Sequence, residues 1–154
     1  MNSQNKIVQV TNQSQRGWKV YYFYPKDFTF VCPTEISAMD KAVELGATVI
    51  GFSGENKFCK INWKQSNKVI GSIQHTLAAD CGLTLANELG IVDNENSVAL
   101  RATFIVDPSE IIQFVSCNPL DTGRNADEIV RTLLALQADG LTGCSWQVGE
   151  DFVA

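Results

Sequence analysis

One short segment, residues 24–35, constrains the fold and the chemistry of this chain more than any other. It reads Tyr-Pro-Lys-Asp-Phe-Thr-Phe-Val-Cys-Pro-Thr-Glu. The aromatic and β-branched run before it, residues 18–24, predicts a buried strand. The apolar spacing after it predicts a helix over residues 33–45. The segment therefore places one cysteine, Cys32, at the junction of a strand and a helix.

The position of Cys32 favours a reactive thiol. The next residue is Pro33, and proline fits the first turn of a helix because its missing N–H is not needed there. At a helix N-terminus, the unpaired N–H groups and the helix dipole favour a negative charge. Such a position stabilises a thiolate, the form of cysteine that acts as a nucleophile. The alternative is a small buried core cysteine, but the strand–loop–Cys-Pro–helix context favours the nucleophile.

Length and charge exclude several classes of protein. A chain of 154 residues is one domain and is large enough to bury a core without staples. The net charge of −5 argues against a nucleic-acid partner or an anionic membrane partner. No apolar run is long enough to span a bilayer, and the polar N-terminus lacks the apolar core of a secretory signal. We therefore expect a cytoplasmic location.

The cysteines argue for redox chemistry rather than for a metal site. They are Cys32, Cys59, Cys81, Cys117 and Cys144. No two of them form a Cys-x-x-Cys pair, and the chain has a single histidine, His75, so we expect no metal and no other cofactor. In a reducing cytosol a disulfide is expected to be catalytic rather than structural. Cys59, Cys81 and Cys117 are interpreted as packing residues, and His75 as structural.

The rest of the chain alternates between strand and helix patterns. Strands are predicted at residues 18–24, 47–53, 75–79, 100–106 and 111–116, and helices at 33–45, 55–68, 83–89 and 125–138. The last two strands are joined by Asp-Pro-Ser-Glu, which predicts a type I hairpin turn because proline suits the second position. This order predicts a thioredoxin-like α/β sandwich, with a mixed central sheet flanked by helices. We divide the chain into a polar segment (1–17), the core domain (18–138) and an irregular tail (139–154).

The junction segment also resembles a known family. Pro25-x-x-x-Thr29-x-x-Cys32 is similar to the active-site signature of the peroxiredoxins. Residues 28–35 resemble the typical two-cysteine branch, which includes the alkyl hydroperoxide reductase C proteins. The resemblance continues through residues 101–108, Gly123-Arg124 and Trp146. It implies the same thioredoxin-like fold and an enzyme that uses thiols to reduce hydrogen peroxide and small organic hydroperoxides.

The reaction defines what the site must supply. A thiolate, here that of Cys32, attacks one peroxide oxygen in line, so the site must align the peroxide and offer donors to the leaving oxygen. The hydroxyl of Thr29 would accept from and donate to the peroxide, or it takes part only in local turn chemistry. By the same resemblance Pro25 would shield the pocket from water, and it also ends the preceding strand.

Three charged residues complete the expected site. Arg101 opens an apolar strand, and by similarity its fork of donors would hold the thiolate and the peroxide oxygens. The alternative is a charge at a strand end that reaches solvent. Glu35 would orient Arg101 and Arg124, although a carboxylate in the first helical turn is favourable by itself. For Arg124, a solvated Gly-Arg after a loop is the alternative.

The oxidised product of Cys32, a sulfenic acid, needs a resolving thiol. The usual pattern in the resembling family is Cys-Pro-Ala-Asn-Trp, whereas this chain has Thr142-Gly-Cys144-Ser-Trp146. Counted back from the tryptophan, Thr142 occupies the usual position and Cys144 is displaced by two residues. We expect Cys144 of the partner subunit in a homodimer to resolve Cys32. The alternative for Cys144 is an idle surface cysteine.

Two rival functions remain open at this point. One is a one-cysteine peroxidase that relies on an external thiol, and the other is a redox sensor or chaperone on the same fold. The resemblance implies dimers, which in this family also assemble into rings, and a thiol reductant such as a thioredoxin-like protein or a dedicated reductase. The loop before Arg101 lacks the Gly-Gly-Leu-Gly of peroxide-sensitive members, and the chain has no helix after the resolving region.

Overall fold

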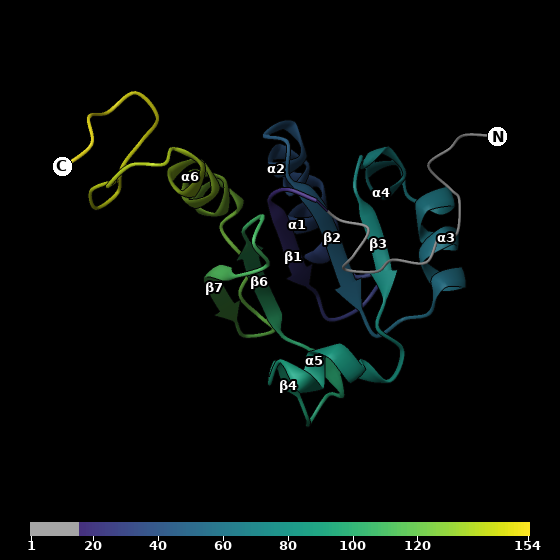
Figure 1. Ribbon diagram of the computed structural model, residues 1–154. Helices are drawn as coiled ribbons and strands as arrows, with labels where there is room; N and C mark the ends of the chain where they lie inside the picture. The colour runs from purple at the N-terminus through teal and green to yellow at the C-terminus, as the bar shows by residue number, and fades with distance from the viewer. Residues whose placement is uncertain (1–15) are drawn as a thin grey trace.

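The computed structural model describes residues 16–154, so the predicted polar segment 1–17 lies almost wholly outside the described residues (Figure 1). A five-stranded mixed sheet forms the centre of the domain, in the order β3-β2-β1-β6-β7. Its strands are β1 (Lys19–Phe23), β2 (Thr48–Ser53), β3 (Thr76–Ala79), β6 (Arg101–Val106) and β7 (Ile112–Asn118). β2 runs parallel to β1 and to β3, while β6 is antiparallel to both β1 and β7.

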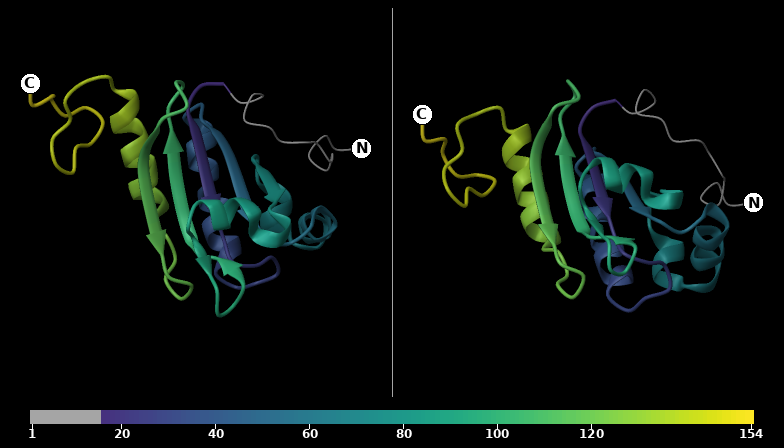
Figure 2. Two further views of the ribbon diagram at one scale, coloured as in Figure 1. Left: turned by 60° about the horizontal axis from the view of Figure 1, so that its bottom comes forward. Right: turned by 90° about the horizontal axis from the view of Figure 1, so that it is seen from below.

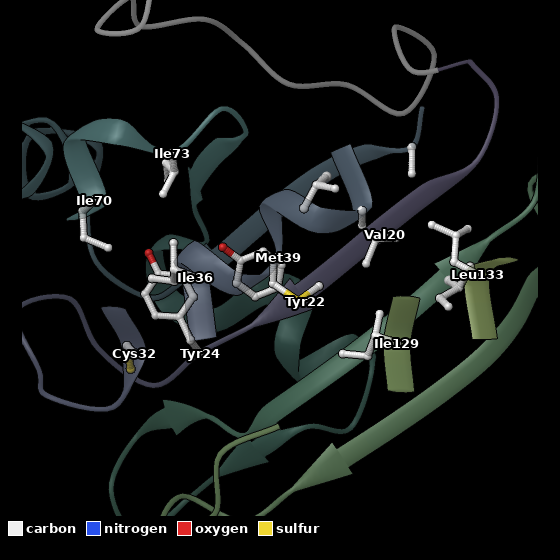
Figure 3. Close-up of a cluster of buried hydrophobic side chains, with 14 of the residues drawn as sticks. Val20, Tyr22, Tyr24, Cys32, Ile36, Met39, Ile70, Ile73, Ile129 and Leu133 are labelled. Atoms are coloured by element: carbon white, nitrogen blue, oxygen red, sulfur yellow. The ribbon is translucent and has the colours of Figure 1, made fainter. Parts of the chain in front are cut away.

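Alternating side chains of the central strand β1 bury both faces of the sheet. Val20, Tyr22 and Tyr24 point into the larger core, where they pack with Ile36 and Leu133 (Figure 3). The helices that contribute to this core are α1 (Cys32–Ala38), α2 (Asp40–Glu44), α3 (Lys57–Ser66), α4 (Lys68–Ser72) and α6 (Ala126–Gln137). Most of the helices therefore cover one face of the sheet.

A smaller core covers the opposite face. There Phe23 packs edge-on against Phe104, at 6.0 Å between ring centroids, together with Ala86 of α5 (Thr84–Glu88). Figure 2 shows α5 and the small sheet beside it on the side away from α6. Because both sheet faces are covered, the predicted α/β sandwich is confirmed.

Two of the predicted helices are divided in the structure. The helix expected over residues 33–45 is interrupted at Met39, which divides it into α1 and α2. The helix expected over residues 55–68 is wrong in extent, because Asn56 and Asn67 each accept two backbone N–H bonds and start separate helices. α3 and α4 result, and α4 was not predicted.

The region between β3 and β6 also differs from expectation. A 3₁₀ turn (Cys81–Leu83) precedes α5. Two short strands follow α5, β4 (Val92–Asp93) and β5 (Val98–Ala99). These strands pair with each other in a two-stranded sheet that the sequence patterns did not indicate. The hairpin between β6 and β7 is confirmed: Glu110 N–H donates to the carbonyl of Asp107 at 3.0 Å, with proline at the second position of the turn.

The tail after α6 is irregular, as predicted, yet it is held closed. Val153 N–H donates to the carbonyl of Leu141 at 2.9 Å, and this bond joins the two ends of the tail. Inside it, the buried indole of Trp146 stacks on Phe152 at 6.1 Å between ring centroids. The tail is thus a compact loop with a small aromatic core. Within residues 16–154, no helix has the length and apolar character needed to cross a membrane.

Candidate active site

The site is built at the junction of β1 and α1. Beyond β1, Tyr24 N–H still donates to the carbonyl of Phe52, and the chain then turns through residues 25–31. Helix α1 begins at Cys32, with Pro33 in its first turn. The side chain of Cys32 is fully buried, at 0 % exposure, beside the larger core (Figure 3). The predicted position of Cys32 at the start of a helix is confirmed.

Arg101, the first residue of β6, contacts this buried sulfur directly. Its Nη1 lies 3.5 Å from Sγ of Cys32 and donates to Oε2 of Glu35 at 2.5 Å. Its Nε donates to the carbonyl of Leu120 at 2.8 Å, which fixes the plane of the guanidinium. Arg101 is buried, so the alternative of a strand-end charge that reaches solvent is wrong.

The charges around Arg101 keep its guanidinium ionised. Burial by itself would lower the pKa of Arg101, but the Cys32 sulfur and the Glu35 carboxylate together raise it above its ordinary value. A charged fork of donors therefore faces the sulfur from inside the protein.

Glu35 bridges two arginines from different elements. Its Oε2 accepts from Arg101, and its Oε1 accepts from the backbone N–H of Arg124 at 2.9 Å and from Nε of Arg124 at 3.0 Å. Both ion pairs are almost completely shielded from solvent. One carboxylate thus faces two guanidinium groups, and one positive charge of this cluster is left uncompensated next to Cys32. The positive charge of Arg101 faces the sulfur at this point.

Arg124 is held more firmly than its loop position suggested. Its Nη1 donates to Oγ1 of Thr103 at 3.0 Å, and its Nη2 donates to the carbonyl of Phe23. The guanidinium also lies over the ring of Tyr22, 5.0 Å from its centroid. The alternative of a solvated Arg124 is wrong. Only the tertiary fold brings these partners together, so no local pattern distinguished this arginine.

Two expected site residues, Thr29 and Pro25, lie in the loop before Cys32. Thr29 donates its hydroxyl to the carbonyl of Lys26 at 3.2 Å, which is the local turn chemistry that the sequence also allowed. Pro25 lies two residues after β1 and is half-buried. It lines a surface pocket of about 450 Å³ between the loop, the turn after β2 and the β4–β5 hairpin.

Cys144 is not brought to the site within one chain. It is exposed, in a turn that is closed by Trp146 N–H donating to the carbonyl of Gly143 at 3.3 Å. Its Sγ lies 3.7 Å from Oγ of Ser145. In Figures 1 and 2 the yellow tail lies beyond α6, on the side away from α1. A bond between Cys32 and Cys144 therefore calls for a second chain or a large rearrangement.

The remaining cysteines and the histidine have simpler surroundings. His75 is buried between the hydroxyl of Tyr22, at 2.7 Å, and a carboxylate oxygen of Asp40, at 2.6 Å, in agreement with a structural role. Cys59 is half-buried, but Cys81 and Cys117 are exposed. The interpretation of these last two as core-packing residues is therefore wrong for the single chain. No group of three metal-ligating side chains is close enough to hold an ion within the described part of the chain.

The structure thus places a buried cysteine at a helix start, facing a charged arginine, on a thioredoxin-like sandwich. Comparison with known proteins agrees. The model of the AhpC/TSA family matches residues 1–115, and the chain belongs to this family. It is 41 % identical over 149 residues to alkyl hydroperoxide reductase C of Mycolicibacterium smegmatis, covering 94 % of this chain and 76 % of that protein.

Solved structures give the same result. The crystal structure of Plasmodium vivax 2-Cys peroxiredoxin in its reduced form superposes with a TM-score of 0.85 at 34 % identity, covering 92 % of this chain and 80 % of that one. That of Enterococcus faecalis AhpC gives a TM-score of 0.83 at 34 % identity, covering 88 % and 84 %. The predicted family, the thioredoxin-like fold and thiol-dependent peroxidase activity are thereby confirmed.

Proposed function

We propose that the chain reduces hydrogen peroxide and small organic hydroperoxides in a cycle that begins at Cys32. The thiolate sulfur attacks one peroxide oxygen, the O–O bond breaks, and the other oxygen leaves as water or an alcohol after taking up a proton. Cys32 becomes a sulfenic acid. The peroxide supplies the oxidising equivalents, so this step needs no further cofactor.

One observation carries this proposal, the uncompensated positive charge of the cluster formed by Glu35, Arg101 and Arg124. Arg101 Nη1 lies 3.5 Å from the sulfur, so the charge acts where the thiolate forms. The same guanidinium offers donors to the charge that develops on the leaving oxygen. Thr29 and Pro25, in the adjacent loop, would align the peroxide and limit water.

The second step joins Cys32 to Cys144 of a partner subunit. The thiol of Cys144 attacks the sulfenic sulfur, a disulfide forms and water leaves. Disulfide geometry needs Cα atoms within about 7 Å, and Cys32 is buried at the start of α1. The first turn of α1 must therefore unwind. Cys144 is exposed on a tail that projects from the domain, which suits an approach to another chain (Figure 1).

A homodimer is supported by the edge of the sheet. β7 is the last strand on its side, and it exposes Ile112 at 49 % and Val115 at 54 %. An apolar edge strand is a ready surface for pairing with a second copy. The tail with Cys144 follows α6, which packs next to this part of the sheet. Rings of such dimers would be a further level of assembly.

The electron donor is proposed as a thiol reductant, either a thioredoxin-like protein or a dedicated reductase. Two thiols of that donor would reduce the Cys32–Cys144 disulfide and regenerate both cysteines. The cytoplasm suits this cycle, because a reducing compartment supplies the thiols that the cycle consumes.

The test is peroxide consumption by the full chain with dithiothreitol as reductant. We expect catalytic turnover that Cys32→Ser abolishes and Cys81→Ser, which replaces an exposed cysteine, leaves intact. Turnover that survives in Cys32→Ser would overturn the assignment of the nucleophile. Stoichiometric oxidation of Cys32 without turnover would favour the redox sensor or chaperone instead.

A further inference from the structure

A second buried charge cluster lies on the other side of the active-site loop. Its acceptor is Asp27, in the middle of the loop and five residues before Cys32. Asp27 Oδ1 accepts from the hydroxyl of Tyr24 at 2.8 Å and from the hydroxyl of Ser53 at 3.0 Å. All three side chains are buried, so the loop is fixed to the ends of β1 and β2 at this point.

The cation of the cluster is Lys60 of α3, whose exposure is only 3 %. Its ammonium donates to Oγ of Ser53 at 2.6 Å and to Oη of Tyr24 at 3.2 Å, and it lies 3.4 Å from Oδ1 of Asp27. Both hydroxyls thus accept from the ammonium and donate to the carboxylate. Lysine and aspartate are almost never this buried unless they are paired.

This ion pair fixes geometry more than it adds stability. A buried ion pair gains little over apolar packing of the same volume, because desolvation offsets most of the attraction. Its directional bonds nevertheless define where Asp27 can lie. Next to it, Phe28 adopts a left-handed backbone (φ +57°) and packs on Trp63 of the same helix, 5.7 Å between ring centroids. Helix α3 therefore holds the loop at two successive residues.

The part of the loop nearest to Cys32 depends on these two anchors. Phe30 is 98 % exposed and Val31 is 40 % exposed, so the chain between Phe28 and α1 is solvated. A shift of Asp27 would pass along the loop to Thr29, two residues later, and then to the first turn of α1. Misplacement of reacting groups by about 1 Å is enough to slow a reaction roughly 100-fold.

We propose that Lys60 is a positioning residue of the peroxidase: through Asp27 it holds the loop that carries Thr29 and leads to Cys32 in the geometry that reacts with peroxide. Lys60 does not touch the sulfur or the substrate. The proposal deepens the function proposed above and rests on it. Sequence patterns missed this residue, although Lys60 lies one helical turn before the buried Trp63 and so shares its inward face.

The protonation of Lys60 gives the proposal a distinctive readout. Burial lowers the pKa of Lys60 below its ordinary value, while Asp27, Cys59 and Glu55 oppose that change. As pH rises through this lowered pKa the ammonium is lost, and Asp27 remains buried without its cation. The rate of peroxide reduction should then begin to fall at a pH lower than the pKa of an exposed lysine. Lys60→Arg, which stays charged, should lack this decline.

The experiment measures, in single turnover, the rate constant for oxidation of Cys32 by hydrogen peroxide in the full chain. We expect Lys60→Met to lower it roughly 10- to 100-fold and Lys60→Arg to restore most of it. Lys57→Met, on the exposed side of the same helix, should leave it unchanged. The later step, disulfide formation, should not slow in Lys60→Met. A merely structural role would impair both steps together.

The outcomes separate this inference from the proposed function. A wild-type chain without turnover would refute the peroxidase, whereas a wild type that turns over beside an equally fast Lys60→Met would refute only the role of Lys60. If Lys60→Met fails to fold, the pH profile of Lys60→Arg decides. Loss of the alkaline decline supports the proposal, and a decline identical to that of the wild type overturns it.

Discussion

Arg101 Nη1 lies 3.5 Å from the sulfur of Cys32, although the two residues are 69 positions apart in sequence. The same nitrogen also donates to Glu35, so one donor group connects the reacting atom to a buried ion pair. In the proposed cycle Arg101 would stabilise negative charge that develops at the sulfur, while its bond to Glu35 fixes the orientation of the guanidinium.

Replacing Arg101 by Ala should slow peroxide reduction roughly 100- to 1,000-fold, the loss typical when one charge-stabilising donor is removed. The rate of alkylation of Cys32 by iodoacetamide at neutral pH should fall as well, because the cation that faces the sulfur is removed. Arg101→Lys keeps the charge but loses the fork and should recover only part of both rates. An alkylation rate equal to that of the wild type in Arg101→Ala would count against the contact.

Replacing Glu35 by Gln should destabilise the fold, because two buried guanidinium groups then lose their shared carboxylate. Breaking a buried ion pair costs about 3–5 kcal/mol, measurable as a lower midpoint in urea unfolding. Glu128→Gln is the matched control, since its pair with Arg131 on α6 lies near the surface and is worth about 0–1 kcal/mol. Equal losses in the two variants would contradict the buried bridge.

The free energy of unfolding should depend on pH through the ionisation of His75. Burial lowers the pKa of His75 below 6.5, more than the contact with Asp40 raises it, and the nearby Lys64 lowers it further. Above pH 6.5 both the folded and the unfolded imidazole are neutral and the effect vanishes. As pH falls below that value the unfolded chain binds a proton first, so the free energy of unfolding decreases until the folded pKa is passed.

The slope attributable to His75 is at most about 1.4 kcal/mol per pH unit. Urea unfolding at pH 5 and pH 7.5 measures it, and His75→Gln should reduce the difference between the two pH values. A pH dependence unaltered by that substitution would show that other groups cause it.

The junction was predictable because its signals are local. A strand pattern, Cys32-Pro33 and a helix pattern follow one another within the sequence, and the structure has them in the same order. The division of residues 57–72 into α3 and α4 was not predicted. Asn56 and Asn67 each start a helix through side-chain bonds that apolar spacing does not reveal.

The charge clusters were predictable only in part. A resemblance to a family indicated Arg101, Glu35 and Arg124, but the bonds of Arg124 to Thr103 and to the backbone of β1 depend on the assembled sheet. Lys60 gave no signal as a site residue, because a lysine within a helical pattern is ordinarily solvated. Its burial follows from the packing of α3 beside the active-site loop.

The last prediction concerns resolution by Cys144. Peroxide treatment of the wild-type chain should give a dimer band on a non-reducing gel, because the tail of one chain reaches Cys32 of another. Cys144→Ser should abolish the band, whereas Cys117→Ser, which replaces another exposed cysteine, should preserve it. Turnover should also persist at high peroxide, since the loop before Arg101 lacks the Gly-Gly-Leu-Gly sequence of peroxide-sensitive members. Resolution then outruns further oxidation of the sulfenic acid. A dimer that persists in Cys144→Ser, or a wild type that turns over while it stays monomeric on that gel, would instead favour the one-cysteine mechanism with an external thiol.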